Sequence, residues 1–290
     1  MKYIIDTDPG IDDAIAIMLG VKNNLDILGF TLATGNVSLE YSENNLKVIE
    51  DVLGIDTKIY KGEIINTCSE GAPFAHGEDG LGNTFFPKVN RDIEKKSAED
   101  FMIEAINENE GNITIICLGS LTNLAHAIEK DNSIVNKLSK VIIMGTSYNP
   151  RSEELYKEFN INVDKDAARK VLSSNIKEIR LVTHEVGVAS YIEKEYIDSL
   201  KESDDDVSRF VYRIAQKYIE FTWEHNHLVG LSTPDPTTIA SVIDESIVEY
   251  GPCKIDDNFN ITLTNKSNIY VSTDFNLEKF RRLFKKTFKN

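Results

Sequence analysis

Four aspartates lie within eight residues near the start of the chain, in the run Asp6-Thr7-Asp8-Pro9-Gly10-Ile11-Asp12-Asp13. Apolar segments before and after this run predict a buried strand, a tight turn and a buried helix. Carboxylates held this close oppose one another's ionisation, and apolar flanks leave little water to screen them. A cation would relieve the repulsion, and oxygen ligands favour a hard ion such as Ca²⁺ or Mg²⁺. The sequence therefore predicts a metal–carboxylate site at the carboxyl end of the first strand.

Other roles for these aspartates remain open at this point. Aspartate is a common turn and N-cap residue, and we assign the capping role to Asp6. An EF-hand is excluded, because a loop that begins at Asp6 would place Ile11 at the glycine position and Ile17 at the bidentate glutamate position. A phosphatase with an aspartyl nucleophile remains an alternative, since Asp6 and Asp8 follow a buried strand with one residue between them.

The charge and the cysteines of the chain narrow the function classes. A net charge of −15 over 290 residues argues against nucleic acid or an anionic membrane surface as a partner. Cys68, Cys117 and Cys253 are far apart and show no C-x-x-C spacing, so we expect reduced thiols and no disulfide or zinc site. Asp6 and Asp8 interrupt the first apolar run too early for a signal peptide, and no stretch is long enough to span a bilayer. We therefore expect a soluble, cytoplasmic protein.

Strand-like and helix-like segments alternate along the chain, which is typical of a mainly parallel sheet covered on both faces. A glycine-rich stretch over 71–82 shows neither the two-residue period of a strand nor the period of a helix, and it is expected to be a long loop. We predict a single α/β domain over residues 1–290, with a Rossmann-like open sheet flanked by helices. The expected strands are 3–5, 28–33, 58–60, 113–118, 141–145, 179–183, 261–264 and 269–272; the expected helices are one from residue 14 on, 40–53, 98–108, one that ends near 129, 167–172, 204–223 and 277–288.

Polar groups follow several of the predicted strands. Open parallel sheets bind ligands at the carboxyl ends of their strands, so we expect these groups to converge on an active site there. Each also has an ordinary explanation: Asn36 as a turn residue, Glu158 as a solvated charge, and Asp235 as an N-cap with Pro236 at the first helical position. The converging set comprises Asp8, Asp12, Asp13, Asn36, the carbonyl of Leu118, Glu158, Asn160 and Asp235.

The aspartate run resembles the D-x-D-P-G-x-D-D signature of the calcium-dependent nucleoside hydrolases, the inosine-uridine preferring N-ribohydrolase family. Further segments follow in the order of that family and extend the resemblance over nearly the whole chain. The resemblance implies an enzyme that hydrolyses the N-glycosidic bond of ribonucleosides to free base and ribose, as a homodimer or homotetramer. The further segments are Ala33-Thr34-Gly35-Asn36, His76-Gly77-Glu78-Asp79-Gly80-Leu81-Gly82, Gly119-Ser120-Leu121-Thr122-Asn123, Glu158-Phe159-Asn160 and Asp235-Pro236.

The resemblance also implies a role for each residue of the converging set. Asp8 and Asp13 would bind Ca²⁺, and the Leu118 carbonyl and Asp235 would complete the protein ligands. Asp8 would also be the general base that takes a proton from the Ca²⁺-bound water. The ribose hydroxyls would be held by Asp12, Asn36, Glu158 and Asn160, with Asp235 assisting.

The residue before Asp235 departs from the family pattern. Many members carry a histidine there, which acts as general acid for the departing base, whereas this chain has Pro234. Proline has no proton to donate, so another residue would have to supply the proton. We expect the catalytic acid to be His225 or His227, which follow the long predicted helix, or His76 in the glycine-rich loop.

A second departure lies shortly before Glu158. Relatives often show Gly-Asn there, whereas this chain has Arg151-Ser152, with Asn149 as a nearby substitute. Together the departures leave alternatives open: an active N-ribohydrolase, an enzyme specialised for a riboside whose leaving group needs no acid, or a non-catalytic relative that binds ribosides. The aspartyl phosphatase ranks last, because it leaves the polar groups of the later strand ends unexplained.

Overall fold

The computed structural model describes residues 1–64, 71–148 and 158–289. Cys68, Asn149 and the pair at 151–152 lie outside the described residues, so the second departure from the family pattern stays a sequence observation. Among the described helices, none combines the length and the apolar composition needed to cross a membrane.

A nine-stranded sheet forms the centre of the described structure. Its strands are β1 (Lys2–Thr7), β2 (Ile27–Leu32), β3 (Ile59–Lys61), β4 (Ile113–Cys117), β5 (Lys140–Met144), β6 (Ile179–Val182), β9 (Val248–Ile255), β10 (Ile261–Leu263) and β11 (Ile269–Phe275). They follow the order β10-β9-β11-β6-β5-β4-β1-β2-β3. Every neighbouring pair from β11 to β3 is parallel, and β9 and β10 extend one edge in antiparallel fashion. The expected mainly parallel α/β sheet is confirmed.

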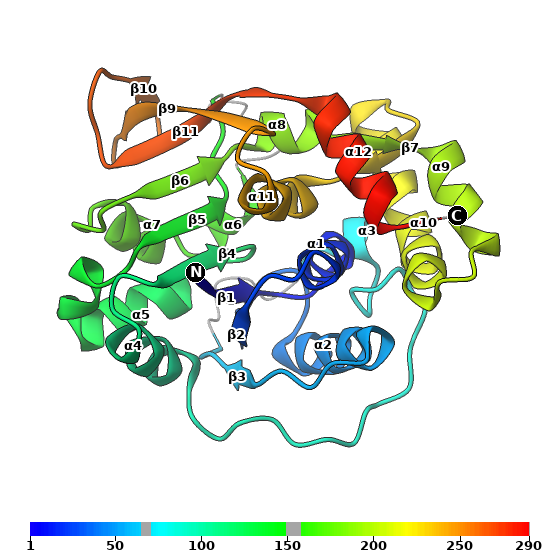
Figure 1. Cartoon of the computed structure of the whole chain (residues 1–290), viewed down its shortest axis with the longest axis horizontal. Helices are drawn as coiled ribbons and strands as arrows, with labels where there is room; N and C mark the ends of the chain where they lie inside the picture. Colours follow the sequence, from blue (N-terminus) through cyan, green and yellow to red (C-terminus); the bar gives the residue numbers. More distant parts are fainter. Residues whose placement is uncertain (65–70, 149–157, 290) are drawn as a thin grey trace.

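Helices cover both faces of this sheet (Figure 1). On one face lie α4 (Ala98–Glu108), α5 (Thr122–Lys130) and α7 (Lys165–Leu172); on the other lie α1 (Ile11–Lys22), α2 (Leu39–Leu53), α10 (Asp206–Asn226), α11 (Pro234–Ile243) and α12 (Leu277–Thr287). Shorter helices are α3 (Pro73–His76), α6 (Phe159–Val163), α8 (His184–Ala189) and α9 (Lys194–Ser199), and β7 (Tyr191–Glu193) pairs with β8 (Gly230–Ser232).

The apolar runs of the central strands account for the two cores. Ile4 pairs with Ile115 and Ile5 with Ile116 in the register of β1 and β4. Because successive side chains point to opposite faces, Ile4 and Ile115 belong to the core under α4 and α5, and Ile5 and Ile116 to the core under α1. All four side chains are fully buried, as continuous apolar strands between two helix layers require.

Several elements were not predicted from the sequence. Strand β9 contains Gly251 and Pro252, two residues that argue against a strand. The register of β9 with β10 covers residues 253–255, so Pro252 lies outside it, where a missing N–H is tolerated. Helix α3 interrupts the segment expected to be a loop, and α6, α8 and α9 are each too short to show a helical period. The strands β7 and β8 have three residues each, which is too few for an alternation to be recognised.

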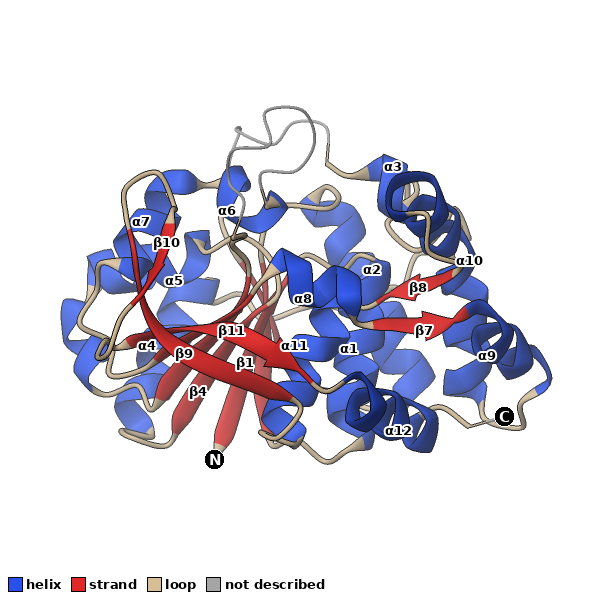
Figure 2. Cartoon of the chain, turned by 90° about the horizontal axis from the view of Figure 1, so that it is seen from above, coloured by secondary structure: helices blue, strands red, loops and turns tan. Residues whose placement is uncertain are grey.

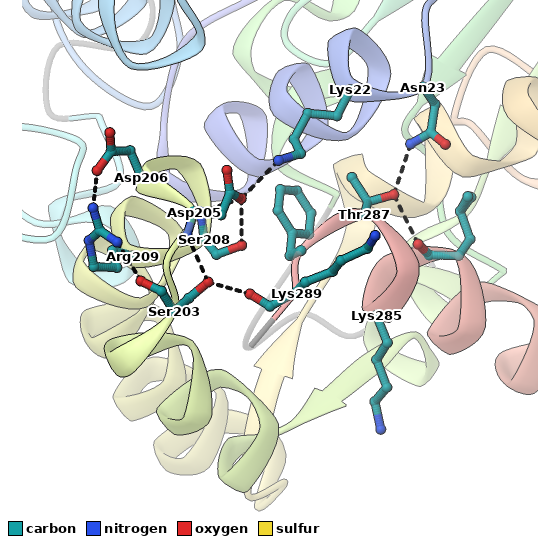
Figure 3. Close-up of polar contacts among 12 residues, drawn as sticks. Lys22, Asn23, Ser203, Asp205, Asp206, Ser208, Arg209, Lys285, Thr287 and Lys289 are labelled. Atoms are coloured by element: carbon teal, nitrogen blue, oxygen red, sulfur yellow. Dashed lines mark hydrogen bonds and ion pairs between the residues drawn. The ribbon is translucent and has the colours of Figure 1, made fainter.

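A polar network fastens the C-terminal helix and the start of α10 to α1 (Figure 3). Lys22 Nζ lies 2.8 Å from Asp205 Oδ2, and the same carboxylate caps α10 by accepting a bond from the Ser208 amide. Asn23 Nδ2 donates to Thr287 Oγ1 at 2.9 Å. These contacts hold α10, whose inner face reaches the candidate active site, against the helix that follows the aspartate turn.

Candidate active site

The turn between β1 and α1 is organised by the carboxylate of Asp13. Its Oδ1 accepts a 2.6 Å bond from Thr7 Oγ1, and its Oδ2 accepts a 3.0 Å bond from the Gly10 amide. Gly10 is the N-cap of α1, so Asp13 in the first turn satisfies an amide that the helix itself leaves unpaired. The side chain of Asp13 is thereby fixed at the carboxyl end of β1.

The capping role assigned to Asp6 is wrong. Asp6 lies inside β1, fully buried, and its Oδ1 accepts bonds from Thr31 Oγ1 at 2.6 Å and from Asn123 Nδ2 at 2.8 Å. Both partners come from distant segments that only the folded sheet brings close. Burial raises the pKa of Asp6 to about 7, and the two hydrogen bonds oppose that shift.

Three carboxylates converge at this end of the sheet. One oxygen from each of Asp12, Asp13 and Asp235 lies within 4.8 Å of the others, and all three side chains are buried. Burial raises the pKa of Asp12 and Asp13 to about 6 each, and it raises the pKa of Asp235 more strongly, reinforced by repulsion from Asp12 and Asp13. Such a cluster stores electrostatic repulsion that a bound cation would remove.

Asp8 lies beside this cluster with one oxygen unpaired. Its Oδ2 accepts a 2.6 Å bond from the Asn36 amide, whereas its buried Oδ1 has no hydrogen-bond partner. A Cβ atom added at Gly35 would lie 1.9 Å from Oδ2, and one added at Gly119 would lie 2.4 Å from Oδ1. Burial and repulsion from Asp13 raise the pKa of Asp8. Two glycine backbones therefore enclose a carboxylate that lacks a proton donor on one oxygen.

Asp235 does not cap its helix, contrary to the ordinary explanation for it. Helix α11 begins at Pro234, Thr233 precedes it as the N-cap, and Asp235 is the second helical residue. Proline at the first position needs no hydrogen-bond partner for its nitrogen. An acidic side chain in the first turn also interacts favourably with the positive end of the helix dipole. Because α11 packs against α1, Asp235 meets the aspartates of the first turn of α1.

Glu158 is buried rather than solvated, again contrary to its ordinary explanation. Its Oε1 accepts a bond from the Asn160 amide at 2.9 Å, and its Oε2 accepts bonds from the Ile161 and Thr146 amides at 2.9 and 3.1 Å. Burial raises the pKa of Glu158 to about 7 against these three bonds. Asn160 Nδ2 donates to the Leu118 carbonyl at 2.7 Å. The strand ends of β4 and β5 are thus joined through this pair.

A cavity of ≈ 140 Å³ opens beside the aspartate cluster. Helices α6 and α8, which contribute to its wall, lie beyond the carboxyl ends of the parallel strands (Figure 2). Aromatic side chains of α3 and α10 form the opposite part of the wall. Of the predicted site residues, the structure brings to this cavity Asp12, Asn36, His76, Leu118, Glu158, Asn160 and Asp235. Asp8 and Asp13 lie beneath the lining, in contact with Asn36.

His76 lines the cavity with its proton placement constrained. Its Nδ1 accepts a 3.1 Å bond from the Ile11 amide, so the ring proton of the neutral imidazole lies on Nε2. Burial lowers the pKa of His76 to about 4. The ring lies 5.2 Å from that of Tyr218 and its Nδ1 lies 3.6 Å from Asp12 Oδ1. His76 is therefore a neutral hydrogen-bond donor at the aspartate side of the cavity.

His225 and His227 are not brought to the cavity. Both are exposed, and neither belongs to its lining. His225 lies in the last turn of α10 with its Nδ1 3.0 Å from the Phe221 carbonyl, and His227 ends the helix in the left-handed conformation. Tyr218 and Phe221 line the cavity, whereas His225 lies one turn further along α10 with its ring 4.3 Å from that of Phe221, outside the lining.

Sequence reasoning missed several residues of the cavity wall. His184 is the first residue of α8, directly after the end of β6, and the strand-end rule could have found it. Tyr218 and Asn226 come from α10, where a buried polar residue cannot be told from a core position by periodicity. Tyr218 Oη donates to Asp12 Oδ2 at 3.4 Å.

Comparison with known proteins places this site in a family. A family model described as inosine-uridine preferring nucleoside hydrolase matches residues 3–282. Uridine nucleosidase 1 of Arabidopsis thaliana is 31% identical over 270 residues, which cover 86% of this chain and 76% of that protein. The inosine-uridine preferring nucleoside hydrolase of Leishmania major is 30% identical over 272 residues, which cover 91% and 85%. The solved structure of a plant nucleoside hydrolase, the PpNRh1 enzyme, aligns with a TM-score of 0.89 and 28% identity over 99% of this chain and 98% of that one.

The fold, the acidic cavity and these relatives together define a glycosidase that acts on N-glycosyl compounds. The chain belongs to the inosine-uridine preferring nucleoside hydrolase family. The family resemblance, the fold class and the enzyme class expected from the sequence are confirmed.

Proposed function

We propose that this enzyme hydrolyses the N-glycosidic bond of ribonucleosides with the help of a Ca²⁺ ion held by Asp8 and by two members of the aspartate cluster, Asp13 and Asp235. The observation that carries the proposal is the convergence of Asp12, Asp13 and Asp235 within 4.8 Å beside a cavity of ≈ 140 Å³. The names of the relatives, a uridine nucleosidase and an inosine-uridine preferring hydrolase, support ribonucleosides as the substrate class. The family assignment replaces the phosphatase alternative.

The donor set fits a hard divalent cation. Asp8, Asp13, Asp235 and the Leu118 carbonyl would hold the ion through oxygen alone, the chemistry that Ca²⁺ prefers. The buried Oδ1 of Asp8 has no hydrogen-bond partner among the described residues, so it is available to a cation. The Leu118 carbonyl accepts one bond from Asn160 and keeps a second lone pair for a ligand. A bound Ca²⁺ would lower the pKa of a water molecule and position it near the sugar.

The side chains of the site then divide the reaction between them. Asp8 takes a proton from the attacking water, whose oxygen bonds to the anomeric carbon as the bond from that carbon to the base nitrogen breaks. The sugar passes through an oxocarbenium-like state, which the surrounding carboxylates stabilise. The hydroxyls of the ribose are oriented by Asp12, Asn36, Glu158, Asn160 and Asp235. An uncharged nucleoside suits this acidic cavity better than a nucleotide.

The departing base needs a proton in most ribonucleosides, and Pro234 lines the cavity without one to give. The lack of a proton donor at position 234 supports a second candidate function: a relative that binds ribosides without turnover, or one specialised for a leaving group that needs no acid. Of the histidines expected to act as catalytic acid, His76 lies at the cavity and His225 and His227 do not. Assembly as a homodimer or homotetramer, a single domain over 1–290 and a cytoplasmic location remain predictions.

A ribose-release panel tests the proposal. Purified enzyme is assayed on purine and pyrimidine nucleosides with added Ca²⁺ and after chelation, beside Asp8→Ala. We expect ribose release that needs Ca²⁺ and is lost in the variant by about two to four orders of magnitude, the usual contribution of a general base. Nucleoside binding by calorimetry without turnover would support the non-catalytic candidate. Equal ribose release by native enzyme and Asp8→Ala would contradict the role of Asp8.

A further inference from the structure

The wall around Pro234 contains a histidine that the proposed mechanism has not used. A Cβ atom added at Gly187 would lie 2.7 Å from Pro234 Cβ, so α8 and the start of α11 touch at this point. His184 precedes Gly187 by three residues on the same short helix, and residues three apart share a helix face. Both His184 and Pro234 line the cavity. The imidazole therefore belongs to the part of the wall where the sequence leaves a proton donor missing.

The position of His184 is fixed by its neighbours. Its amide donates a 3.0 Å bond to the Thr146 carbonyl, which ties the start of α8 to the end of β5. Glu185 Oε1 accepts bonds from Ser147 Oγ at 2.6 Å and from the Tyr148 amide at 2.9 Å. These contacts hold the first turn of α8 against the segment after β5. A donor on this turn has a defined place in the wall, as a catalytic acid requires.

His76 and Tyr218 also line the cavity, and both lie on the side of the aspartates. His76 accepts the Ile11 amide and lies beside Asp12, on the side of the proposed metal and ribose. Tyr218 donates to Asp12, and burial together with the charge of Asp12 raises its pKa, so it releases a proton poorly. Both contact the aspartate that would hold the ribose.

We propose that His184 is the general acid that protonates the departing base, an inference that rests on the proposed ribohydrolase function. As the bond between the anomeric carbon and the base nitrogen breaks, its electron pair moves into the base. The imidazolium of His184 transfers a proton to a nitrogen or oxygen of that base and becomes neutral. The base leaves as a neutral molecule, and the proton is restored from solvent before the next turnover.

The charges around His184 set its protonation. Burial lowers the pKa of His184, and the carboxylate of Glu185 on its own helix opposes this. The elements packed against α8 carry two further carboxylates, Asp235 of α11 and the exposed Asp274 of β11. The carboxylate of Glu158 lines the same cavity. The protonated fraction of His184 therefore increases as the pH falls below neutrality.

The test compares substrates whose leaving groups differ in their need for a proton. Native enzyme, His184→Gln and His126→Gln are assayed with Ca²⁺ on inosine, uridine and 4-nitrophenyl β-D-ribofuranoside, because nitrophenolate leaves without protonation. We expect kcat on the nucleosides to fall about 100-fold or more in His184→Gln, with little change on the nitrophenyl riboside. His126→Gln carries the same substitution on α5, outside the cavity lining, and should match native enzyme. The rise in nucleoside turnover as the pH falls should disappear in His184→Gln alone.

The nitrophenyl riboside also reports whether the variant retains its folded site. Equal loss on all three substrates, in His184→Gln and in His184→Asn, would assign a structural role and overturn the inference. Unchanged nucleoside turnover would overturn it as well. If native enzyme released ribose from none of the substrates, the proposed function itself would fail, which is a distinct result.

Discussion

The Asn36 amide donates a 2.6 Å hydrogen bond to Asp8 Oδ2, and this bond connects the ends of two parallel strands inside the candidate active site. The bond orients the carboxylate so that the other oxygen, Oδ1, is left without a donor. Asn36 Nδ2 also donates to Asp13 Oδ2 at 3.0 Å. A single asparagine thus positions two of the proposed metal ligands through its backbone and its side chain.

Gly35→Ala is expected to disable the site without unfolding the enzyme. The new methyl group would lie 1.9 Å from Asp8 Oδ2 and must displace that carboxylate. We expect loss of Ca²⁺ affinity in calorimetry and at least a tenfold lower kcat, about 1.4 kcal/mol in the transition state. Gly111→Ala is the control, because no atom lies within 4 Å of its added Cβ and its effect is limited to backbone strain at a φ of +72°. Equal activity in the two variants would contradict the proposed position of Asp8.

The metal-free enzyme is expected to lose stability as the pH rises. Burial raises the folded-state pKa of Asp12 and Asp13 to about 6 and that of Glu158 to about 7. A carboxyl group with a raised folded pKa binds its proton more tightly in the folded state. Its stabilisation is therefore complete below its ordinary pKa, near 4, and is lost as the pH rises through 6 to 7.

Urea unfolding in a chelator across pH 4.5 to 8, repeated with excess Ca²⁺, measures this effect. We expect the free energy of unfolding to fall with pH in the chelator and to stay higher with Ca²⁺ at pH 7. At a hundred times its dissociation constant, a ligand specific for the folded state adds about 2.7 kcal/mol. Identical pH profiles with and without Ca²⁺ would argue against a metal in the cluster.

Glu158→Gln is expected to weaken both the fold and the site. The two carboxylate oxygens accept bonds from the amides of Asn160, Ile161 and Thr146, and glutamine would turn an NH₂ group toward at least one of them. A buried donor left unpaired costs about 1 to 3 kcal/mol, so urea unfolding should shift accordingly and KM should rise. Glu40→Gln is the matched control, because Glu40 is 82% exposed and pairs with the exposed Lys88. A urea-unfolding midpoint in Glu158→Gln equal to that of the native enzyme would show that these hydrogen bonds contribute little to stability.

Asp205→Ala is expected to lower stability and leave the chemistry intact. Asp205 caps α10 through the Ser208 amide and pairs with Lys22 (Figure 3). Losing the cap should lower the free energy of unfolding by about 1 kcal/mol, up to about 2. Asp206→Ala tests the neighbouring carboxylate, which pairs with Arg209 and is 81% exposed; it should change the unfolding midpoint much less. Ribose release by both variants below their melting temperatures should equal that of native enzyme.

The parts of the site that sequence could predict are those encoded by neighbouring residues. The aspartate run carries its own turn and helix start, so Asp8, Asp12 and Asp13 follow from local spacing. The strand-end rule adds Asn36, and the family resemblance adds Asp235. The partners that give Asp6 its role are Thr31 and Asn123, which become neighbours only when β1, β2 and α5 pack together.

The cavity wall was harder to predict for the same reason. Whether a histidine reaches the cavity depends on where its helix begins and ends: His225 and His227 lie at the end of α10, beyond the lining, and His184 lies at the start of a helix of six residues. A helix that short leaves no periodic signal in the sequence. Strand β9 was missed because Gly251 and Pro252 contradict strand propensity, which tertiary pairing with β11 overrides.

The outermost strands of the sheet, β3 and β10, have three residues each. Short edge strands are a known protection against strand addition between molecules. At β3 and β10, extension of the sheet from one molecule into the next is therefore disfavoured.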